Sequence, residues 1–291
     1  MNDLISGSID LHMHTSVSDG TDTPEGIIRR VKEAGISLFS VTDHDSVKSA
    51  VIILRNLRSD DPRFITGVEF SCRDELGKYH ILGYGYRPAS RAVRRVANKA
   101  HAMRENKVRA RLEFIDREFG FSFTDSDVRS LLSKDNPGKP HIANLMIKYG
   151  YAESREQAIR QYLNKARFES EYIRPEEAVS AIRKGGGVPV LAHPAYGSGE
   201  ELILGGQMIS RLRRLTDMGL EGIEAFYSGF TAKIRNEMLV LAERFGLYVT
   251  AGSDYHGANK LIRIGDTGLE KSRELPEGLL KFIDRVVPET E

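Results

Sequence analysis

Short apolar runs alternate with helix-forming segments over the first third of the chain and again over its last two fifths. Residues 38–42 (LFSVT) and 64–70 (FITGVEF) have the composition of buried strands, whereas residues 24–34 and 47–57 carry apolar side chains at helical spacing. Further strands are predicted at residues 79–84, 188–194, 220–226 and from 247, and further helices at 175–184, 207–218, 231–245 and 276–286. Because strands separated by helices pair in parallel, the pattern predicts an α/β fold, either a barrel or an open wound sheet.

A helical block interrupts this alternation after Pro88. The pattern predicts a long helix from Arg91 to a stop at Gly120, followed by helices at residues 125–132, 142–148 and 154–165 with no strand between them. Residues 99–165 contain 13 basic and 9 acidic residues, against 29 and 32 in the rest of the chain. We therefore expect residues 99–165 to form a helical insertion, or cap, domain suited to anionic ligands, packed over a body made of residues 1–98 and 166–291.

The cysteine content indicates a reducing compartment, whereas the near-zero net charge does not indicate a particular binding partner. The 291 residues carry a formal net charge of +1 and only one cysteine, Cys72, so no internal disulfide is possible and a reducing compartment is expected. Residues 1–7 lack the basic start and the apolar run of a signal peptide. No apolar run approaches the roughly 20 residues that cross a bilayer. The expectation is a cytoplasmic protein with no membrane partner and an oligomeric state that the sequence leaves open.

The first predicted strand carries two closely spaced histidines. In an extended strand Asp10, His12 and His14 point to one side, and Leu11 and Met13 point to the other. Two neutral imidazoles on one surface can chelate a transition metal such as Zn, Fe or Mn. For this pair alone, two core histidines satisfied by hydrogen bonds remain an equal alternative.

Most of the other metal-competent side chains also lie at or just beyond the ends of predicted strands. The others are Asp19, His44, Glu69, His80, His193, Asp254 and His256. The carboxyl ends of the strands of a parallel α/β barrel meet at one face, so these residues are predicted to share one cavity with His12 and His14. Six of the eight histidines of the chain belong to this set, which a scatter of structural histidines would not produce.

The sequence resembles the PHP (polymerase and histidinol phosphatase) superfamily in a series of motifs that occur in order. They are residues 12–14 (HMH), 42–44 (TDH), 67–69 (GVE), 80–83 (HILG), 192–194 (AHP) and 253–256 (SDYH). The resemblance implies a distorted (β/α)7 barrel that holds two or three divalent metals. It places His12, His14, Glu69 and Asp254 on the first metal, Glu69, His80 and His193 on the second, and Asp19, His44 and His256 on the third. Asp10 is expected either to orient a ligand imidazole or to be structural, and Asp43 and Asp45 are expected to be loop and cap residues.

This ligand set predicts a phosphoesterase. Three divalent ions would exceed the charge of the three carboxylates among the ligands, so the pocket should attract a phosphate dianion. A water molecule bound by the metals, rather than a side chain, is the expected nucleophile of an in-line hydrolysis. Histidine-rich ligation favours Mn, Fe or Zn over Mg.

The insertion directs the substrate prediction toward nucleotides. The chain most resembles stand-alone bacterial members that carry such an insertion. That resemblance implies removal of the 3′-phosphate from nucleoside 3′,5′-bisphosphates, with trimming of short oligonucleotides in some relatives. Lys139 and His141, aided by Arg104 or Arg109, are the candidates for holding the 5′-phosphate. Lys139 stands where relatives commonly have arginine, and it lacks the bidentate fork of that residue. A solvated helix face for either arginine, and a cap or core role for His141, are the alternatives.

Three other functions compete with this prediction. A histidinol-phosphate phosphatase would need a carboxylate to meet the amine of its substrate, which the basic insertion does not favour. A 5′-to-3′ exonuclease would need a basic groove with stacking aromatics; Phe121, Phe123, Tyr149 and Tyr151 could supply the aromatics or could belong to the core. A non-catalytic metal-binding module would be expected to have lost ligands, and all nine motif positions are filled.

Overall fold

The computed structural model describes residues 8–168, 171–196, 202–269 and 274–287. Residues 1–7, on which the signal-peptide prediction depends, lie outside this set. The chain forms two compact units. The sheet unit comprises Met1–Ala97 and Ile173–Glu291, and the helical unit comprises Asn98–Tyr172. Of the helices in the described part of the chain, none has both the length and the apolar character needed to span a membrane.

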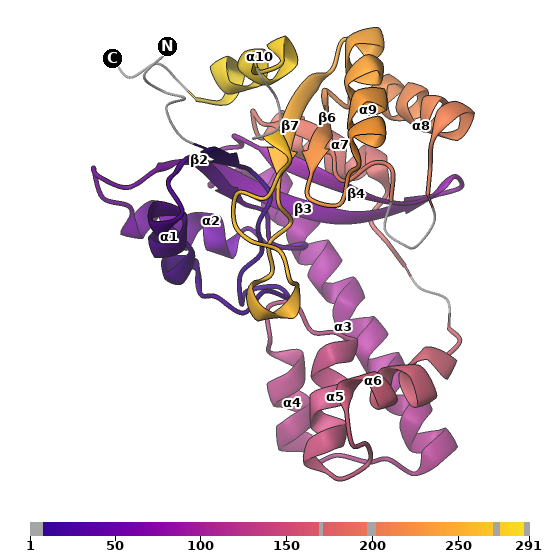
Figure 1. The fold of residues 1–291 in the computed structure, drawn as a ribbon. Helices are drawn as coiled ribbons and strands as arrows, with labels where there is room; N and C mark the ends of the chain where they lie inside the picture. Colours follow the sequence, from indigo (N-terminus) through magenta and orange to yellow (C-terminus); the bar gives the residue numbers. More distant parts are fainter. Residues whose placement is uncertain (1–7, 169–170, 197–201, 270–273, 288–291) are drawn as a thin grey trace. The chain divides into compact units, whose positions relative to one another are not determined.

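Seven strands form one sheet whose spatial order follows the chain (Figure 1). They are β1 (Ser8–Asp10), β2 (Ile36–Val41), β3 (Arg63–Asp74), β4 (Gly77–Tyr84), β5 (Val188–Leu191), β6 (Gly222–Tyr227) and β7 (Tyr248–Gly252). The predicted α/β fold with seven strands is confirmed. The strand pairs are parallel except β3–β4 and β4–β5, which are antiparallel. The expectation that helix-separated strands pair in parallel is therefore wrong for β4 and β5, because a tight turn before Gly77 reverses β4 relative to β3.

Backbone hydrogen bonds from the residues after β1 to the end of β7 and the residues after it link the two edges of the sheet. Leu11 N–H donates to Ala251 O over 2.9 Å, and Asp254 N–H donates to His12 O over 2.8 Å. His14 N–H donates to Tyr255 O over 2.8 Å. Regular strand structure ends at Asp10, earlier than the side-chain alternation suggested, but these bonds keep the next four residues beside the end of β7 and the residues that follow it.

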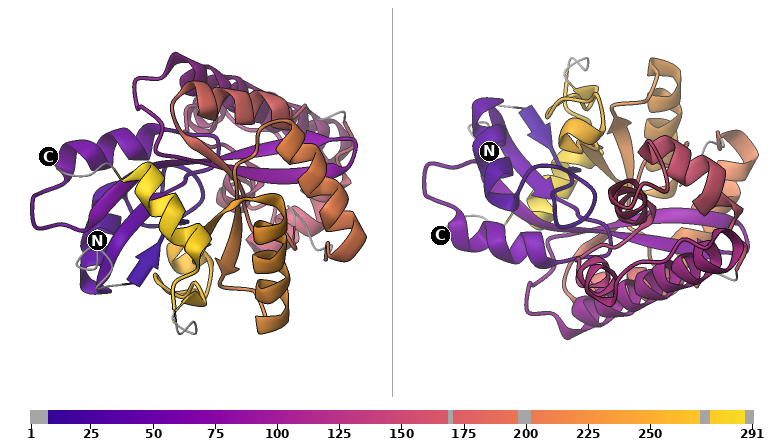
Figure 2. Two further views of the ribbon diagram at one scale, coloured as in Figure 1. Left: turned by 90° about the horizontal axis from the view of Figure 1, so that it is seen from above. Right: turned by 90° about the horizontal axis from the view of Figure 1, so that it is seen from below.

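Helices flank the sheet in the sheet unit. They are α1 (Pro24–Glu33), α2 (Lys48–Asn56), α7 (Pro175–Lys184), α8 (Gly205–Asp217), α9 (Ala232–Phe245), α10 (Glu277–Val286) and the short η4 (Gly257–Asn259). Helix α1 begins as predicted, with Thr23 Oγ1 accepting from Gly26 N–H and Pro24 at the first position. Its residues Ile27 and Val31 are buried against Phe39 of β2, so α1 covers the start of the sheet. Two further views show α9 and α10 beside the last strands (Figure 2).

The helical unit has a core of its own. It contains most of α3 (Arg91–Phe119), with α4 (Asp125–Leu132), α5 (Lys139–Lys148), α6 (Arg155–Gln157), the π-helical η2 (Ala158–Tyr162) and the 3₁₀ turn η3 (Leu163–Lys165). Val108, Ile115 and Met146 are buried at its centre. Phe121 stacks on Tyr151 with 4.4 Å between ring centroids, and both rings pack against this core. These contacts favour the core interpretation of those aromatics over a stacking groove for bases.

Candidate metal centre

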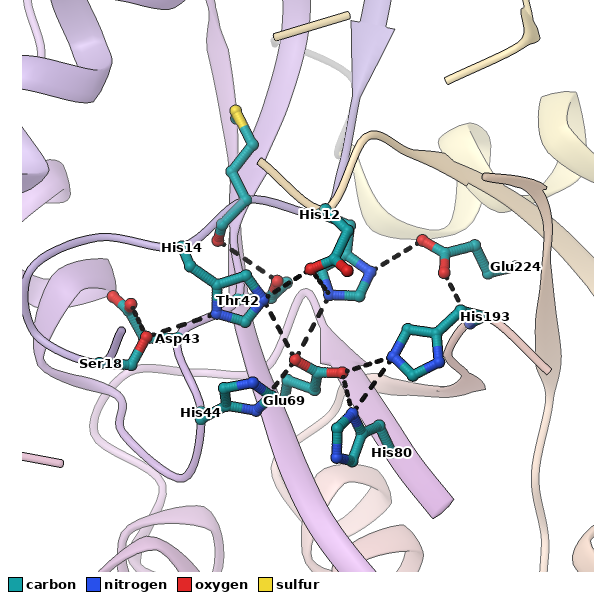
Figure 3. A network of polar contacts seen from close by, with 12 residues as sticks. His12, His14, Ser18, Thr42, Asp43, His44, Glu69, His80, His193 and Glu224 are labelled. Carbon is teal, nitrogen blue, oxygen red and sulfur yellow. Dashed lines mark hydrogen bonds and ion pairs between the residues drawn. The ribbon is translucent and has the colours of Figure 1, made fainter. Parts of the chain in front are cut away.

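Glu69 is the centre of a cluster of imidazoles (Figure 3). It lies on β3 with its side chain buried. Its Oε2 atom lies 3.1–3.3 Å from ring nitrogens of His12, His14 and His44. Its Oε1 atom lies 2.8 Å from His80 Nδ1 and 3.2 Å from His193 Nε2. One carboxylate therefore faces five histidines that come from widely separated parts of the sequence.

His80 reaches the cluster because β4 is antiparallel to its neighbours. It is the fourth residue of β4 and pairs with Ser71, two residues beyond Glu69, so both side chains lie on one face of the sheet. In a wholly parallel sheet this position would lie near the wrong end of its strand. The reversal thus places His80 Nδ1 3.2 Å from His193 Nε2, which follows β5.

A second group of ligand atoms surrounds Asp19. His14, Asp19, His44 and His256 each offer one atom, and these four atoms lie within 4.8 Å of one another. His256 Nε2 is 3.3 Å from Asp19 Oδ1, and His44 Nε2 is 3.7 Å from Asp19 Oδ2. The three histidines are largely buried, whereas the Asp19 side chain is 41% exposed, so Asp19 marks the open side of the cluster.

Asp254 closes a third group with His12 and His14. Its Oδ1 atom is 3.6 Å from His12 Nε2 and 3.3 Å from His14 Nε2. Its Oδ2 atom points away from them and accepts from Tyr227 Oη over 3.1 Å and from Lys260 Nζ over 2.7 Å. Tyr227 and Lys260 were not predicted from the sequence, and neither residue lies in a motif that could have indicated this contact.

The structure brings all nine predicted metal-competent residues into these overlapping groups. The four predicted substrate-binding residues lie in the helical unit. Lys139 and His141 share the first turn of α5, where Lys139 Nζ donates to Asn164 Oδ1 over 2.6 Å. Arg104 and Arg109 lie on α3, and five residues correspond to about 140° around a helix, so these two side chains do not share a face.

The chemistry of the cluster suits divalent metals. Within the described residues, the buried side-chain atoms without a hydrogen-bond partner include His12 Nε2, His14 Nε2, His44 Nδ1 and Glu69 Oε2. Buried polar atoms are normally satisfied, and imidazole nitrogens and carboxylate oxygens are ligands that Zn, Mn and Fe accept. Four such atoms facing one another therefore fit the coordination of a metal better than they fit a hydrogen-bond network.

The imidazoles also control the charge of the carboxylates. Burial alone would raise the pKa of Glu69, but the neighbouring His44 and His80 outweigh burial and hold this pKa well below its usual range. Burial would likewise raise the pKa of Asp254, and His12 and His14 again reverse the effect. Both carboxylates are therefore ionised at neutral pH, which is the form that binds a cation.

A buried carboxylate braces the loops that carry His14 and His44. Asp43 accepts from Thr15 N–H over 2.8 Å and from Thr15 Oγ1 over 2.6 Å. It also accepts from the hydroxyls of Ser18, over 2.5 Å, and Ser49. Asp43 is thus the loop residue that was predicted, and it joins the segment after His14 to the segment before His44.

We expect Asp43→Asn to lower the free energy of unfolding by about 1–3 kcal/mol. The amide NH₂ of asparagine cannot accept the hydrogen bonds that the carboxylate now receives, so it would face N–H or O–H donors without a partner. Denaturant unfolding of the metal-loaded protein measures the loss. Asp60→Asn is the matched control, since Asp60 forms an exposed ion pair with Lys32 and should contribute little to stability. Equal losses in the two variants would contradict the bracing role.

Asp10 is structural, whereas Glu224 contacts a predicted ligand imidazole, the other role that was considered for Asp10. The carboxylate of Asp10 accepts backbone N–H groups of His12 (3.3 Å), Ser253 (2.9 Å) and Gly265 (2.8 Å), so it fixes the backbone rather than a ring. Glu224 is the carboxylate that contacts Nδ1 of the His12 ring, at 2.9 Å. The sequence analysis did not single out Glu224, although an acidic residue inside the apolar strand pattern at 220–226 was a signal that could have done so.

The sequence matches a family model and is similar to several phosphoesterases. Residues 10–173 match the model of the PHP domain family. A 3′,5′-nucleoside bisphosphate phosphatase of Chromobacterium violaceum is 28% identical over 264 residues, which cover 86% of this chain and 87% of that protein. A phosphoribosyl 1,2-cyclic phosphate 1,2-diphosphodiesterase of Eggerthella lenta is 28% identical over 260 residues, which cover 85% and 94%. The 5′-3′ exoribonuclease Rnm of Salmonella typhimurium is 26% identical over 264 residues, which cover 88% and 87%.

The fold has a close counterpart among solved structures. A crystal structure of a Bifidobacterium adolescentis protein aligns with 98% of this chain over 98% of its own length, with a TM-score of 0.79 and 24% sequence identity. At this identity the likeness shows the fold, and the nature of the site rests on the side chains themselves.

Proposed function

The chain belongs to the PHP domain family, and from this premise and the side chains of the metal centre we propose that it removes the 3′-phosphate of nucleoside 3′,5′-bisphosphates and leaves the 5′-mononucleotide. As a member of the family it is a hydrolase that acts on phosphoric ester bonds. The observation that carries the proposal is the cluster of nine metal-competent side chains around Glu69, in a chain that resembles a bisphosphate phosphatase over 86% of its length.

The nine residues are proposed to hold two or three Mn, Fe or Zn ions, which would supply an activated water and neutralise charge on the phosphoryl group. Glu69 serves two sides of the cluster, because its two oxygens face different histidines. Asp19 lies on the open side, where a substrate can enter. Lys260, whose side chain is 38% exposed beside Asp254, adds a positive charge at the edge of the cluster that attracts a dianion.

The second phosphate of the substrate would bind the start of α5. Lys139 and Pro140 open this helix, and Gly138 caps it without a side-chain hydrogen bond. The positive end of the helix dipole and the Lys139 ammonium both favour an anion at this end. A phosphate here would distinguish a bisphosphate from a nucleoside monophosphate.

A 5′-to-3′ exonuclease acting on short oligonucleotides is the second candidate, and the similarity to the Salmonella exoribonuclease favours it. Both reactions need the same metal centre, but an exonuclease must also bind the nucleotides that follow the scissile bond. Phe121 and Tyr151 stack on each other and pack against the core of the helical unit, which does not favour a platform for those bases.

A substrate panel separates the candidates. Phosphate or nucleotide release is measured with Mn-loaded protein on a nucleoside 3′,5′-bisphosphate, a 5′-phosphorylated oligonucleotide, phosphoribosyl 1,2-cyclic phosphate and histidinol phosphate. We expect the highest kcat/KM for the bisphosphate, with phosphate leaving from the 3′ position. A higher value for any of the other three compounds would replace the proposed substrate by that compound.

We expect Lys139→Ala to raise the KM for the bisphosphate by about 10–100-fold, the equivalent of one hydrogen bond to a charged group of roughly 1.5–3 kcal/mol. The KM for a nucleoside 3′-monophosphate should change little, because that compound lacks the second phosphate. Lys148→Ala is the control, since Lys148 lies at the other end of α5 and pairs with Asp127. An unchanged KM for the bisphosphate in Lys139→Ala would remove Lys139 from the substrate site.

A further inference from the structure

Glu224 connects two histidines of the metal centre (Figure 3). It lies on β6 and is fully buried, with 0% of its surface exposed. Its Oε1 atom is 2.9 Å from His12 Nδ1, and its Oε2 atom accepts the backbone N–H of His193 over 2.7 Å. One carboxylate therefore holds the ring of one predicted ligand and the main chain of another.

The contact with His12 fixes the state of its ring. A carboxylate oxygen only accepts, so His12 Nδ1 carries a hydrogen and Nε2 is the nitrogen left to bind a metal. His12 Nε2 is the atom that lies 3.3 Å from Glu69 Oε2 and 3.6 Å from Asp254 Oδ1. Glu224 thus orients the imidazole from behind and directs its free nitrogen into the cluster.

The contact with His193 fixes a strained backbone. His193 has a φ of +26°, in the left-handed region that a histidine rarely adopts. Such conformations persist only where neighbouring groups hold them, and the 2.7 Å bond from His193 N–H to Glu224 is one such restraint. In this conformation His193 Nε2 lies 3.2 Å from both Glu69 Oε1 and His80 Nδ1.

Close packing holds the Glu224 side chain in this place. Gly252, the last residue of β7, lies so near that a Cβ atom there would overlap both the Cβ of His12 and the Oε1 of Glu224. The glycine allows the end of β7 to approach, and the contact leaves the carboxylate no room to turn toward β7. Glu224 is therefore held in a fixed position beside the cluster.

We propose that Glu224 is a positioning residue that presents His12 and His193 to the metals as one preformed unit, without itself being a ligand. Both of its oxygens are already occupied by N–H donors, which leaves neither directed at a metal. This inference rests on the metal centre of the proposed function but not on the identity of its substrate.

Metal titration of the Glu224→Gln variant tests the inference. Glutamine has the shape of glutamate, but it can accept only one of the two N–H donors, and its NH₂ group opposes the other. Metal-free protein is titrated with Co(II) and with Mn(II), and the dissociation constants are obtained by competition with a chelator. Because outer hydrogen bonds to metal ligands typically contribute 10–100-fold in metal affinity, we expect a weakening of that size and a changed Co(II) absorption spectrum.

Glu221→Gln is the matched control. Glu221 lies three residues earlier in the chain and forms an ion pair with Arg183 at the surface. The metal affinity of the Glu221→Gln variant should therefore equal that of the unchanged protein. An unchanged affinity and spectrum in Glu224→Gln would overturn the proposal. So would a lower unfolding midpoint of the metal-free variant with no change in metal affinity, which is the result expected of a purely structural residue.

A second variant covers the case in which Glu224→Gln does not fold. Glu224→Asp keeps the charge and both acceptors but withdraws them by one methylene, and the same loss of affinity is expected. Since these titrations contain no substrate, failure of bisphosphate hydrolysis in the substrate panel would leave their result unaffected. The two proposals can therefore fail separately.

Discussion

Replacing Glu69 by glutamine is expected to lower the kcat of phosphate ester hydrolysis by about 10³-fold or more. The carboxylate faces five imidazoles, and it is the residue shared by the groups on either side of it. An amide of the same size loses the negative charge and half of the acceptor capacity, so metals on both sides would be displaced or held less tightly. A loss of about 4 kcal/mol of transition-state stabilisation corresponds to a 10³-fold lower kcat.

Steady-state kinetics and metal analysis of the same Glu69→Gln preparation measure this effect. Glu75→Gln is the control, because Glu75 follows the same strand but is exposed and pairs with Arg174 and Arg214. The control should retain its metal and its activity. A Glu69→Gln variant with full metal content and a kcat within tenfold of the unchanged protein would show that Glu69 does not bridge the metal sites.

The nine metal-competent residues were predictable because most of them stand at a strand end or in the loop after it, although Glu69 and His80 lie within β3 and β4. His12 and His14 share a side of the chain through simple alternation, and Asp254 and His256 repeat that spacing after the last strand. The order of the strands along the sheet also follows the chain, so little had to be known beyond which segments form strands. Local pattern and global arrangement agree here, which is why the inference from sequence carried far.

Glu224, Tyr227 and Lys260 escaped prediction for a different physical reason. None of the three lies in a recognised motif. Glu224 and Tyr227 contact residues that are distant in the sequence, and only the folded sheet brings Glu224 to His12. Periodicity specifies which face of a strand a side chain occupies, but it does not identify the atom on the neighbouring strand that the side chain meets. Interactions that support a ligand from behind therefore become visible only with the structure.

The pairing of β4 is the clearest case in which the structure differs from the predicted parallel arrangement. The short turn before Gly77 predicts a hairpin, and a hairpin makes β4 antiparallel. Because helices separate β5 from β4, these two strands were expected to pair in parallel. The structure instead pairs β5 antiparallel to β4, and this choice is what brings His80 and His193 together across the sheet.

Removal of the metals is expected to abolish hydrolysis and to lower the thermal midpoint of unfolding. A ligand that binds only the folded state stabilises it by about 2.7 kcal/mol at a concentration 100-fold above its dissociation constant. For a domain of this size class, that corresponds to a fall in Tm of about 5 °C or more when the ligand is removed. The unsatisfied nitrogens of His12, His14 and His44 around Glu69 add to the cost of the metal-free state.

Chelator-treated protein, dialysed and then reloaded with Mn, Fe or Zn, provides the measurement by calorimetry and by phosphate release. Reloading should restore both the Tm and the activity, and the metal that restores most at the lowest concentration is the best candidate for the native one. The Glu69→Gln variant is the control, because its Tm should respond much less to added metal. Full activity in chelated protein that contains no metal by elemental analysis would rule out the metal-dependent mechanism, and with it the role of every residue placed around Glu69.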